Sequence, residues 1–469
     1  MPRGRSAAVP GVVFGTDGWR GIMAGEVTFR GFGDLAGAAS SWLRARRGRG
    51  RVLVGFDRRF LSPEFASFSA SVFAGEGHRV SLCREPVPTS AASLFTARGF
   101  DLAFVVTASH NPPEYNGAKL KWEGGSAPPE VMDGIASRLG GRGRRVPAGK
   151  VGSFDPFPAY LGYLRSRVPL RRPRGTAPVF AADCMHGCAG GLLPLMREFR
   201  GTRLLRAAHD PLFGGTAPEP IERNLGALAA EVRRTGALAG FAFDGDADRF
   251  ALLDERGRYV SPALLFGLLT DLLIKRGLRG RLVQSVSMGR VSRAAAEAAG
   301  LEVKEVPVGF KWLGRELRAG GTLAAAEESG GYTWAGNLPE RDGPLCALFF
   351  MELLESSGRP LSVMLRDLQR DYGPSAYLRS DIALRRVPPG GPSAFLDGLA
   401  AAFRPPRALG TPVSVSRIDG LKLGFAGGGW LLMRLSGTEP LLRLYAETAD
   451  GRLTEDLLRR AAGAAGELP

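Results

Sequence analysis

The chain has 469 residues, 62 Lys and Arg against 46 Asp and Glu, a formal net charge of +16 and four cysteines, a size that predicts two to four domains. No apolar run is long enough to cross a bilayer, the first residues lack a signal peptide, and so few cysteines do not make a disulfide framework, so we expect a cytoplasmic protein with no membrane partner. The basic clusters lie in Gly/Pro-rich connections without aromatic residues, so we expect no nucleic-acid partner and favour a positive cleft for phosphorylated metabolites.

The chain begins with a glycine-rich segment over residues 14–21 that carries Arg20. Thr28 is a candidate N-cap for the helix that follows, because apolar residues recur there at helical spacing. Residues 52–56 are predicted as a buried strand. Ser62 followed by Pro63 predicts the start of a helix that runs to Gly75.

The loop after the next strand, residues 102–106, carries the most informative residues of the chain. It presents Ser109 beside His110, and Lys119 follows ten residues later. Parallel α/β sheets place their ligands at the ends of such strands. An exposed serine oxygen with a base and a cation nearby predicts covalent chemistry at Ser109.

An acidic loop follows the strand predicted over residues 240–243, which comes after an earlier strand at 179–182. In this loop three carboxylates occupy alternating positions, Asp244, Asp246 and Asp248, and Arg249 follows them. Clustered oxygen ligands are what a hard cation such as Mg²⁺ requires, and the loop lacks the spacing of an EF-hand. We therefore predict a metal site here rather than a solvated acidic turn.

The third stretch repeats this layout with strands predicted at residues 282–286 and 322–326, after a helix at 263–275 that Ser261 caps. The loop after the last strand carries Glu327 and Ser329, acceptors that suit the hydroxyl groups of a sugar. Lys311 lies between them and the earlier strand, in a segment with two aromatic residues. We include it as a candidate substrate-binding residue.

Beyond about residue 370 strands cluster, with predicted ranges of 378–384, 413–418, 421–425, 430–435 and 442–446 and helices at 393–403 and 453–464. The segment that begins at Arg434 offers hydroxyls and backbone N–H groups at Ser436, Gly437 and Thr438, and Arg443 follows it. Such a segment is typical of a phosphate site, because arginine adds bidentate donation.

These segments predict an α/β protein with three similar α/β units and a C-terminal α+β unit around a central cleft. In each of the first three units a second strand ending in a polar loop follows the first strand by roughly 40 to 60 residues. We place the domains at residues 1–150, 151–257, 258–371 and 372–469, with the serine, metal, sugar and phosphate loops in that order.

Taken together, four motifs resemble the α-D-phosphohexomutase superfamily, most closely bacterial phosphoglucomutase/phosphomannomutase. They are Thr-Ala-Ser-His-Asn-Pro, Asp-Gly-Asp-Ala-Asp-Arg, Glu-Glu-Ser-Gly-Gly and Arg-Leu-Ser-Gly-Thr-Glu-Pro. The resemblance spans nearly the whole chain and implies four domains with mixed sheets. It implies an intramolecular phosphotransferase that interconverts hexose 1-phosphate and hexose 6-phosphate, with Mg²⁺ as cofactor and a sugar 1,6-bisphosphate as primer and intermediate.

The resemblance also assigns roles to residues. Ser109 matches the phosphoserine, which completes the Mg²⁺ site with the three aspartates. The residues around the reacting phosphate match Arg20, His110, Lys119 and Arg249; the sugar loop matches Glu327 and Ser329; and the distal-phosphate loop matches Arg434, Ser436, Gly437 and Thr438.

One departure concerns the general acid/base. Many mannomutase-type and glucosamine-type relatives carry a histidine at the end of the sugar loop, where this chain has Gly331 followed by Tyr332. The loop, together with residues 339–343, is more similar to glucomutase-type members, so glucose is the favoured sugar. Lys119 is our first candidate to relay the hydroxyl proton, since crowding by cations would lower the pKa of its ammonium.

Alternatives within the family are mannose or glucosamine phosphate as substrate. A phosphosugar phosphatase is disfavoured because its acceptor, water, needs no second phosphate-binding loop. A non-catalytic phosphosugar-binding protein is disfavoured because Ser109, the three aspartates and Lys119 are all present. The sequence does not separate a monomer from a homodimer, and it leaves open the metal preference and the phosphorylation state of Ser109.

Overall fold

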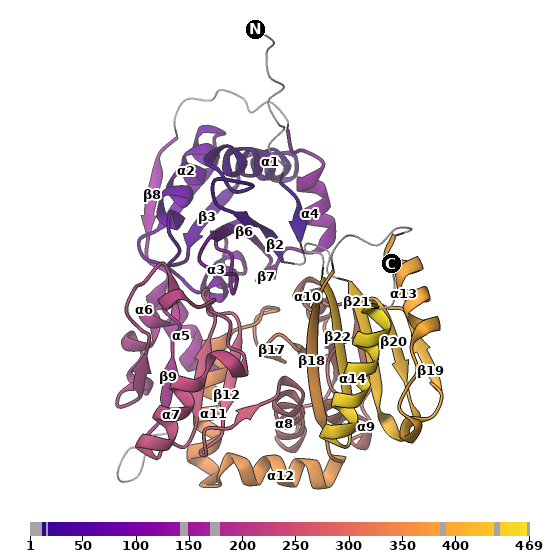
Figure 1. Ribbon diagram of the computed structural model, residues 1–469. Helices are drawn as coiled ribbons and strands as arrows, with labels where there is room; N and C mark the ends of the chain where they lie inside the picture. The colour runs from indigo at the N-terminus through magenta and orange to yellow at the C-terminus, as the bar shows by residue number, and fades with distance from the viewer. Residues whose placement is uncertain are drawn as a thin grey trace. The chain divides into compact units, whose positions relative to one another are not determined.

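The computed structural model describes residues 12–15, 17–140, 149–168, 179–384, 391–435 and 441–466 (Figure 1). The chain divides into two compact units, one of Met1–Arg258 with Gly336–Gly358 and the other of Tyr259–Ala335 with Arg359–Pro469. Within the described ranges, no helix combines the length and the hydropathy that a membrane crossing requires.

The first unit contains a large mixed sheet with the strand order β1-β2-β6-β5-β3-β4-β8, and β7 pairs with β6. Strands β3, β4, β5 and β8 are parallel, whereas β6 runs antiparallel to β5 and β2 runs antiparallel to β6. The strands are β1 (Phe14–Gly15), β2 (Gly18–Ile22), β3 (Arg51–Phe56), β4 (Arg79–Cys83), β5 (Leu102–Val106), β6 (Tyr115–Trp122), β7 (Gly125–Ser126) and β8 (Val151–Phe154). Every residue of β5 is buried, as its continuous apolar run predicts for an interior strand.

Four helices accompany this sheet: α1 (Phe29–Arg47), α2 (Ser62–Gly75), α3 (Thr89–Thr96) and α4 (Pro129–Ala136). Thr28 caps α1 as predicted, since its Oγ1 accepts a hydrogen bond from Gly31 N–H at 3.1 Å. The predicted cap at Ser62 is wrong. Ser62 is itself the first residue of α2, so it does not occupy the cap position, and its hydroxyl instead donates to the buried Asp57 carboxylate at 2.7 Å.

A second mixed sheet of this unit has the order β10-β9-β11-β12, with β9, β10 and β11 parallel and β12 antiparallel to β11. Its strands are β9 (Ala181–Asp183), β10 (Arg203–Leu205), β11 (Gly240–Phe243) and β12 (Phe250–Leu253). The unit also contains α5 (Phe157–Arg167), α6 (Ala189–Leu192), α7 (Gly226–Thr235), α11 (Gly343–Ser357) and short 3₁₀ turns at Leu193–Leu195, Arg197–Phe199, Phe213–Gly215 and Glu222–Asn224.

Asp342 caps α11 and makes the stability of this unit depend on pH. Its Oδ1 accepts hydrogen bonds from Leu345 N–H at 3.0 Å and from the Tyr160 hydroxyl at 2.8 Å. Burial raises the pKa of Asp342 to about 7. The folded state therefore keeps a proton that the unfolded state loses near pH 4, so stability falls as the pH rises from about 4 to 7.

Asp342→Asn keeps the cap and the acceptor but has no charge to bury. We expect the variant to exceed the native chain in stability by a few kcal/mol at pH 8 and by little at pH 4. Denaturant unfolding of both proteins at the two pH values measures this difference. A gap of the same size at both pH values would contradict the prediction.

The second unit contains a mixed sheet of order β15-β14-β16-β17, in which only β17 is antiparallel. Its elements are β13 (Tyr259–Val260), α8 (Pro262–Lys275), β14 (Arg281–Ser285), α9 (Arg290–Ala298), β15 (Val303–Val306), α10 (Phe310–Ala319), β16 (Thr322–Glu327), β17 (Gly331–Trp334) and α12 (Leu361–Tyr372). Ser261 caps α8 as predicted, accepting from Leu264 N–H at 3.3 Å.

The same unit ends in an antiparallel sheet of order β18-β22-β21-β20-β19 (Figure 1). Its elements are β18 (Ala376–Ala383), α13 (Gly391–Ala402), β19 (Ser414–Ser416), β20 (Leu421–Gly424), β21 (Trp430–Leu435), β22 (Leu441–Thr448), α14 (Gly451–Gly466) and 3₁₀ turns at Arg407–Leu409 and Ala426–Gly428. Leu431, Met433, Leu442 and Leu444 share a core with residues of α13 and α14. The predicted fold class, three mixed α/β sheets followed by an α+β part, is confirmed.

Candidate active site

Ser109 lies in the loop that follows β5. It is fully buried rather than exposed as predicted, because its hydroxyl is directed at the acidic loop. Its Oγ donates a hydrogen bond to Asp244 Oδ2 at 2.6 Å, and its backbone N–H donates to Thr107 Oγ1 at 2.8 Å. The serine has a φ of +54°, a left-handed backbone that residues other than glycine rarely adopt. The two loops that the sequence singled out separately therefore meet in one place.

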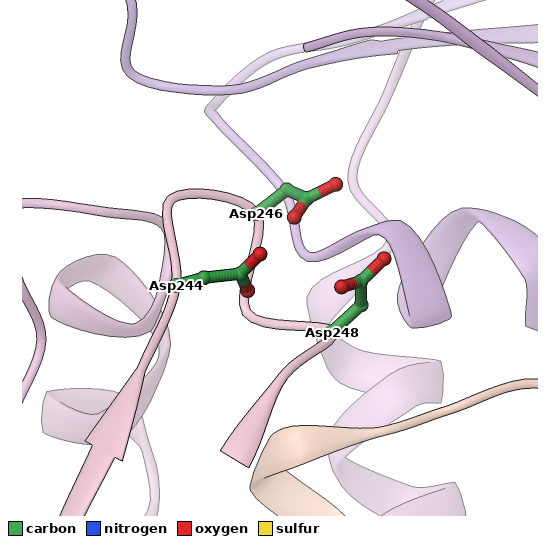
Figure 2. A group of neighbouring side chains, drawn as sticks. All are labelled: Asp244, Asp246 and Asp248. Atoms are coloured by element: carbon green, nitrogen blue, oxygen red, sulfur yellow. The ribbon is translucent and has the colours of Figure 1, made fainter. Parts of the chain in front are cut away.

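The acidic loop joins β11 to β12 and holds three buried carboxylates. Figure 2 shows the side chains of Asp244, Asp246 and Asp248 gathered around one space, and a ligand oxygen from each lies within 4.8 Å of the others. Burial and the two neighbouring carboxylates raise the pKa of Asp244 well above its usual range. Burial opposes ionisation of Asp248 as well, but Arg341 and Lys119 lower its pKa below the usual range.

This donor set fits a hard divalent cation. Asp246 Oδ1 and Asp248 Oδ1 are buried and accept no hydrogen bond from any described residue. Buried carboxylate oxygens without a donor are costly unless a cation satisfies them. The three aspartates could therefore hold a metal ion, which is the role that the sequence predicts for them.

Lys119, on β6, has surroundings opposite to those predicted. Its Nζ lies 3.0 Å from Asp17, 2.8 Å from Asp246 and 2.5 Å from Asp248. Burial alone would lower the pKa of Lys119, but the three carboxylates outweigh it and raise that pKa above its usual value. The predicted lowering of this pKa is wrong because carboxylates, rather than cations, surround the Lys119 ammonium.

We expect Lys119→Met, which removes the charge at similar length, to lower kcat about 10²–10³-fold, the usual effect of losing one electrostatic contact to a reacting group. Between pH 8 and pH 10 the rate of the native chain should change with pH in the same way as that of the variant, because the raised pKa keeps Lys119 protonated in that range. A pH profile of both proteins tests this expectation. A rate that climbs with pH in the native chain alone would restore Lys119 as the base.

The other residues predicted around the reacting group lie in the same unit. Arg20, on β2, donates from Nη1 to Asn111 Oδ1 at 3.1 Å, which ties it to the serine loop. Arg249 Nη2 lies 3.5 Å from His110 Nε2, and Arg249 Nη1 lies 3.5 Å from Glu219 Oε1. The structure thus brings a serine, a histidine, three aspartates and three cations together.

Two charged residues that form ion pairs in this cluster, Arg341 and Asp17, were not predicted from the sequence. Arg341 contacts Asp17, and its Nε lies 2.9 Å from Asp248. Both residues lie in segments noted for other reasons, Asp17 in the glycine-rich segment with Arg20 and Arg341 within residues 339–343. No spacing could pair them, because 324 positions separate them.

Lys121 is also part of this unit but has a structural role. It is fully buried, and its Nζ donates to Glu340 Oε2 at 2.6 Å and to Ser126 Oγ at 3.2 Å. The ion pair links β6 to the segment that precedes α11. Because its ammonium pairs with Glu340, we do not include Lys121 among the candidate site residues.

In the second unit the predicted sugar loop joins β16 to β17. Glu327 ends β16 and is buried, and Ser329 Oγ is buried without a hydrogen-bond partner among the described residues. The intervening Glu328 accepts from the Ser287 hydroxyl at 2.5 Å. Gly331 begins β17, so this position has no side chain where many mannomutase-type and glucosamine-type relatives carry a histidine.

Two further predicted residues of the second unit, Lys311 and Arg434, have aromatic or acidic neighbours. Lys311, in α10, has its ammonium 5.7 Å from the centre of the Trp312 ring. Arg434 Nε donates to Asp419 Oδ2 at 2.7 Å. Arg434 on β21 lies directly opposite Arg443 on β22 in the strand register. Ser436, Gly437 and Thr438 lie outside the described residues. The two arginines nevertheless share one face of the sheet, because directly paired positions do so.

Four family models match successive parts of the chain. They are described as phosphoglucomutase/phosphomannomutase alpha/beta/alpha domain I over residues 11–142, domain II over 158–257, domain III over 263–372 and the C-terminal domain over 396–464.

Individual relatives match over almost their whole length. A phosphoglucomutase/phosphomannomutase of Thermococcus kodakarensis is 29% identical and covers 93% of this chain and 94% of the relative. A phosphoglucosamine mutase of Acidothermus cellulolyticus is 31% identical over 93% of this chain and 91% of the relative. The crystal structure of a Thermus thermophilus protein assigned as a phosphomannomutase is 31% identical with a TM-score of 0.85, and covers 98% of this chain and 100% of that one.

Proposed function

Because the chain belongs to the phosphoglucomutase/phosphomannomutase family of phosphotransferase isomerases, we propose that it interconverts hexose 1-phosphate and hexose 6-phosphate through a phosphoserine at Ser109 and a sugar 1,6-bisphosphate. The observation that carries this proposal is the 2.6 Å contact between Ser109 Oγ and Asp244 inside a buried cluster of carboxylates and cations. A serine in that position can store a phosphoryl group beside charges that stabilise its transfer.

Each half-reaction exchanges one bond for another. A free hydroxyl oxygen of the sugar phosphate forms a bond to phosphorus while the bond from phosphorus to Ser109 Oγ breaks, and the hydroxyl proton leaves to a base. The bisphosphate then presents its other phosphate. Ser109 Oγ forms a bond to that phosphorus while the bond from phosphorus to the sugar oxygen breaks, and the base returns the proton to that oxygen. Arg20, Arg249 and Lys119 are the cations that would offset charge on the phosphoryl oxygens.

With Lys119 held protonated, His110 is the candidate proton acceptor that remains beside Ser109. It is the next residue along the loop, and Arg249 lies 3.5 Å from its Nε2. An imidazole nitrogen is a chemical group that can accept the hydroxyl proton. We assign this role to His110 as part of the proposal.

We propose that Asp244, Asp246 and Asp248 hold Mg²⁺, with an oxygen of the phosphorylated serine completing the site. When bound, the cation would offset negative charge on the phosphoryl group during transfer. The unsatisfied oxygens of Asp246 and Asp248 support this assignment.

We also propose substrate-binding residues in the second unit. Ser329 Oγ is a buried hydroxyl without a described partner, as a contact for a sugar hydroxyl would be. Arg434 and Arg443 stand together on one sheet face and suit a phosphate. We retain Glu327, Lys311, Ser436, Gly437 and Thr438 as proposed substrate-binding residues.

Glucose phosphate is the substrate we propose, and glucosamine phosphate is the second candidate. Gly331 and the neighbouring Glu-Glu-Ser motif favour glucose, whereas the relative from Acidothermus cellulolyticus is named a phosphoglucosamine mutase. Initial rates with glucose, mannose and glucosamine 1-phosphates, each with Mg²⁺ and a trace of bisphosphate, decide between them. A 6-phosphate product supports a mutase, release of inorganic phosphate supports a phosphatase, and fastest turnover of glucosamine phosphate would overturn the glucose assignment.

A further inference from the structure

Arg59 is almost fully buried behind the serine loop, in the segment between β3 and α2, with 1% of its surface exposed. Its two Nη groups donate to four backbone carbonyls, three in that loop and one at Tyr115, the first residue of β6. Nη2 donates to Ser109 O at 2.7 Å and Asn111 O at 2.6 Å, and Nη1 donates to Pro112 O at 2.7 Å and Tyr115 O at 3.1 Å.

The remaining N–H of this guanidinium faces Asp57, the residue after β3. Arg59 Nε lies 3.2 Å from Asp57 Oδ2. With four N–H groups on backbone carbonyls and the fifth toward Asp57, the planar fork has none left for a phosphoryl group. The Phe213 ring, with its centre 4.9 Å from the guanidinium carbon, occupies the face of the fork.

Asp57 reaches the other side of the same serine through Thr107. The Thr107 hydroxyl donates to Asp57 Oδ2 at 2.6 Å, and its oxygen accepts from Ser109 N–H at 2.8 Å. One buried ion pair therefore holds both the N–H and the C=O of Ser109. Asp57 Oδ1 in turn accepts hydrogen bonds from the Ser62 hydroxyl at 2.7 Å and from the backbone N–H of Arg59 at 3.0 Å.

The serine loop contains an unfavourable backbone conformation that its surroundings must support. Ser109 has a φ of +54°, and a left-handed residue other than glycine costs about 1–3 kcal/mol unless its surroundings enforce it. Pro112 and Pro113 have no N–H to donate, and the carbonyls of Ser109 and Asn111 accept from the Arg59 guanidinium.

We infer that Arg59, with Asp57 and Thr107, is a positioning residue that fixes the direction of Ser109 Oγ for phosphoryl transfer, an inference that rests on the proposed function. It makes no contact with the reacting atoms. Its effect should therefore fall on the rate of transfer and leave the binding of sugar phosphate nearly unchanged. Lysine cannot replace it, since a single ammonium lacks the planar fork that reaches four carbonyls.

The test compares Arg59→Lys with Arg58→Gln, a matched control from the neighbouring position whose Nη1 donates to Ala207 O instead. For Arg59→Lys we expect kcat about 100-fold lower, the scale of an ångström-sized misplacement, with KM within about threefold of the native value. Hydrogen exchange of a peptide covering residues 107–115 should be at least about tenfold faster in Arg59→Lys and unchanged in Arg58→Gln.

A folded Arg59→Lys with native kcat, or with a raised KM at native kcat, would overturn the inference. Should that variant fail to fold, Thr107→Val removes only the hydroxyl that links Ser109 to Asp57, and we expect a kcat about tenfold lower at native KM; an unchanged kcat in Thr107→Val would also overturn it. If the native chain turned over no sugar phosphate, the proposed function would fail, whereas the exchange comparison would still decide the role of Arg59.

Discussion

Ser109→Ala is expected to lower turnover of glucose 1-phosphate by at least about 10⁴-fold, because alanine has no oxygen to carry the phosphoryl group between the two ends of the sugar. The loss should be in kcat, since Ser109 is the acceptor rather than a contact for the distal phosphate. Two measurements check it: the rate of 6-phosphate formation, and the intact mass of the protein after incubation with the bisphosphate, which should gain one phosphoryl group in the native chain only.

The matched control is Ser90→Ala. Ser90 is another fully buried serine of the same unit, on α3, but its hydroxyl pairs with the Tyr160 hydroxyl at 2.7 Å. We expect Ser90→Ala to keep its rate within about threefold of the native chain and to accept the phosphoryl group. A phosphorylated, active Ser109→Ala would show that another residue stores the group, and the proposed mechanism would fail.

The sequence predicts this region well where local pattern determines structure. The strands before the serine loop and the acidic loop begin and end at the predicted residues, Leu102–Val106 and Gly240–Phe243. Continuous apolar runs of that length occur in buried strands, and polar residues directly after them mark the strand ends where sites form.

Contacts between distant segments could not be predicted in the same way. The carboxylates around Lys119 come from two loops, and Arg341 reaches Asp17 and Asp248 from a segment far along the chain. We expected cations around Lys119 because the sequence gives the number of charged residues but not their positions in the fold. The pKa of a buried group depends on which charges lie within a few ångströms, so the predicted direction was reversed.

Several predictions remain untested by the structure. The domain boundaries after residues 150, 257 and 371, a cytoplasmic location and the choice between monomer and homodimer stay predictions. The described residues do divide into two compact units. Each unit contains part of the predicted chemistry, with the serine and acidic loops in the first and the sugar loop in the second.

Removal of divalent metal is expected to lower turnover at least about 10³-fold, with full recovery when Mg²⁺ is returned, because the buried carboxylates and the phosphoryl group would otherwise repel one another. Asp246→Asn removes one negative charge from the set while keeping its size. This variant should require at least about tenfold more Mg²⁺ for half-maximal rate, on the scale of losing one interaction at a metal site. Titration of the metal-free native chain and the variant with Mg²⁺ measures both effects.

Asp254→Asn provides the control for this titration, because Asp254 is also buried in the first unit but binds the backbone N–H groups of Arg256 and Arg258 at 2.9 and 2.8 Å. Asparagine can keep both hydrogen bonds through its Oδ1, so the Mg²⁺ requirement should not change. A native chain that remained fully active after exhaustive chelation would contradict the metal assignment. An equal increase in the Mg²⁺ requirement of both variants would also contradict the metal assignment. It would mean that the loss of any negative charge in the first unit weakens Mg²⁺ binding, wherever that charge lies.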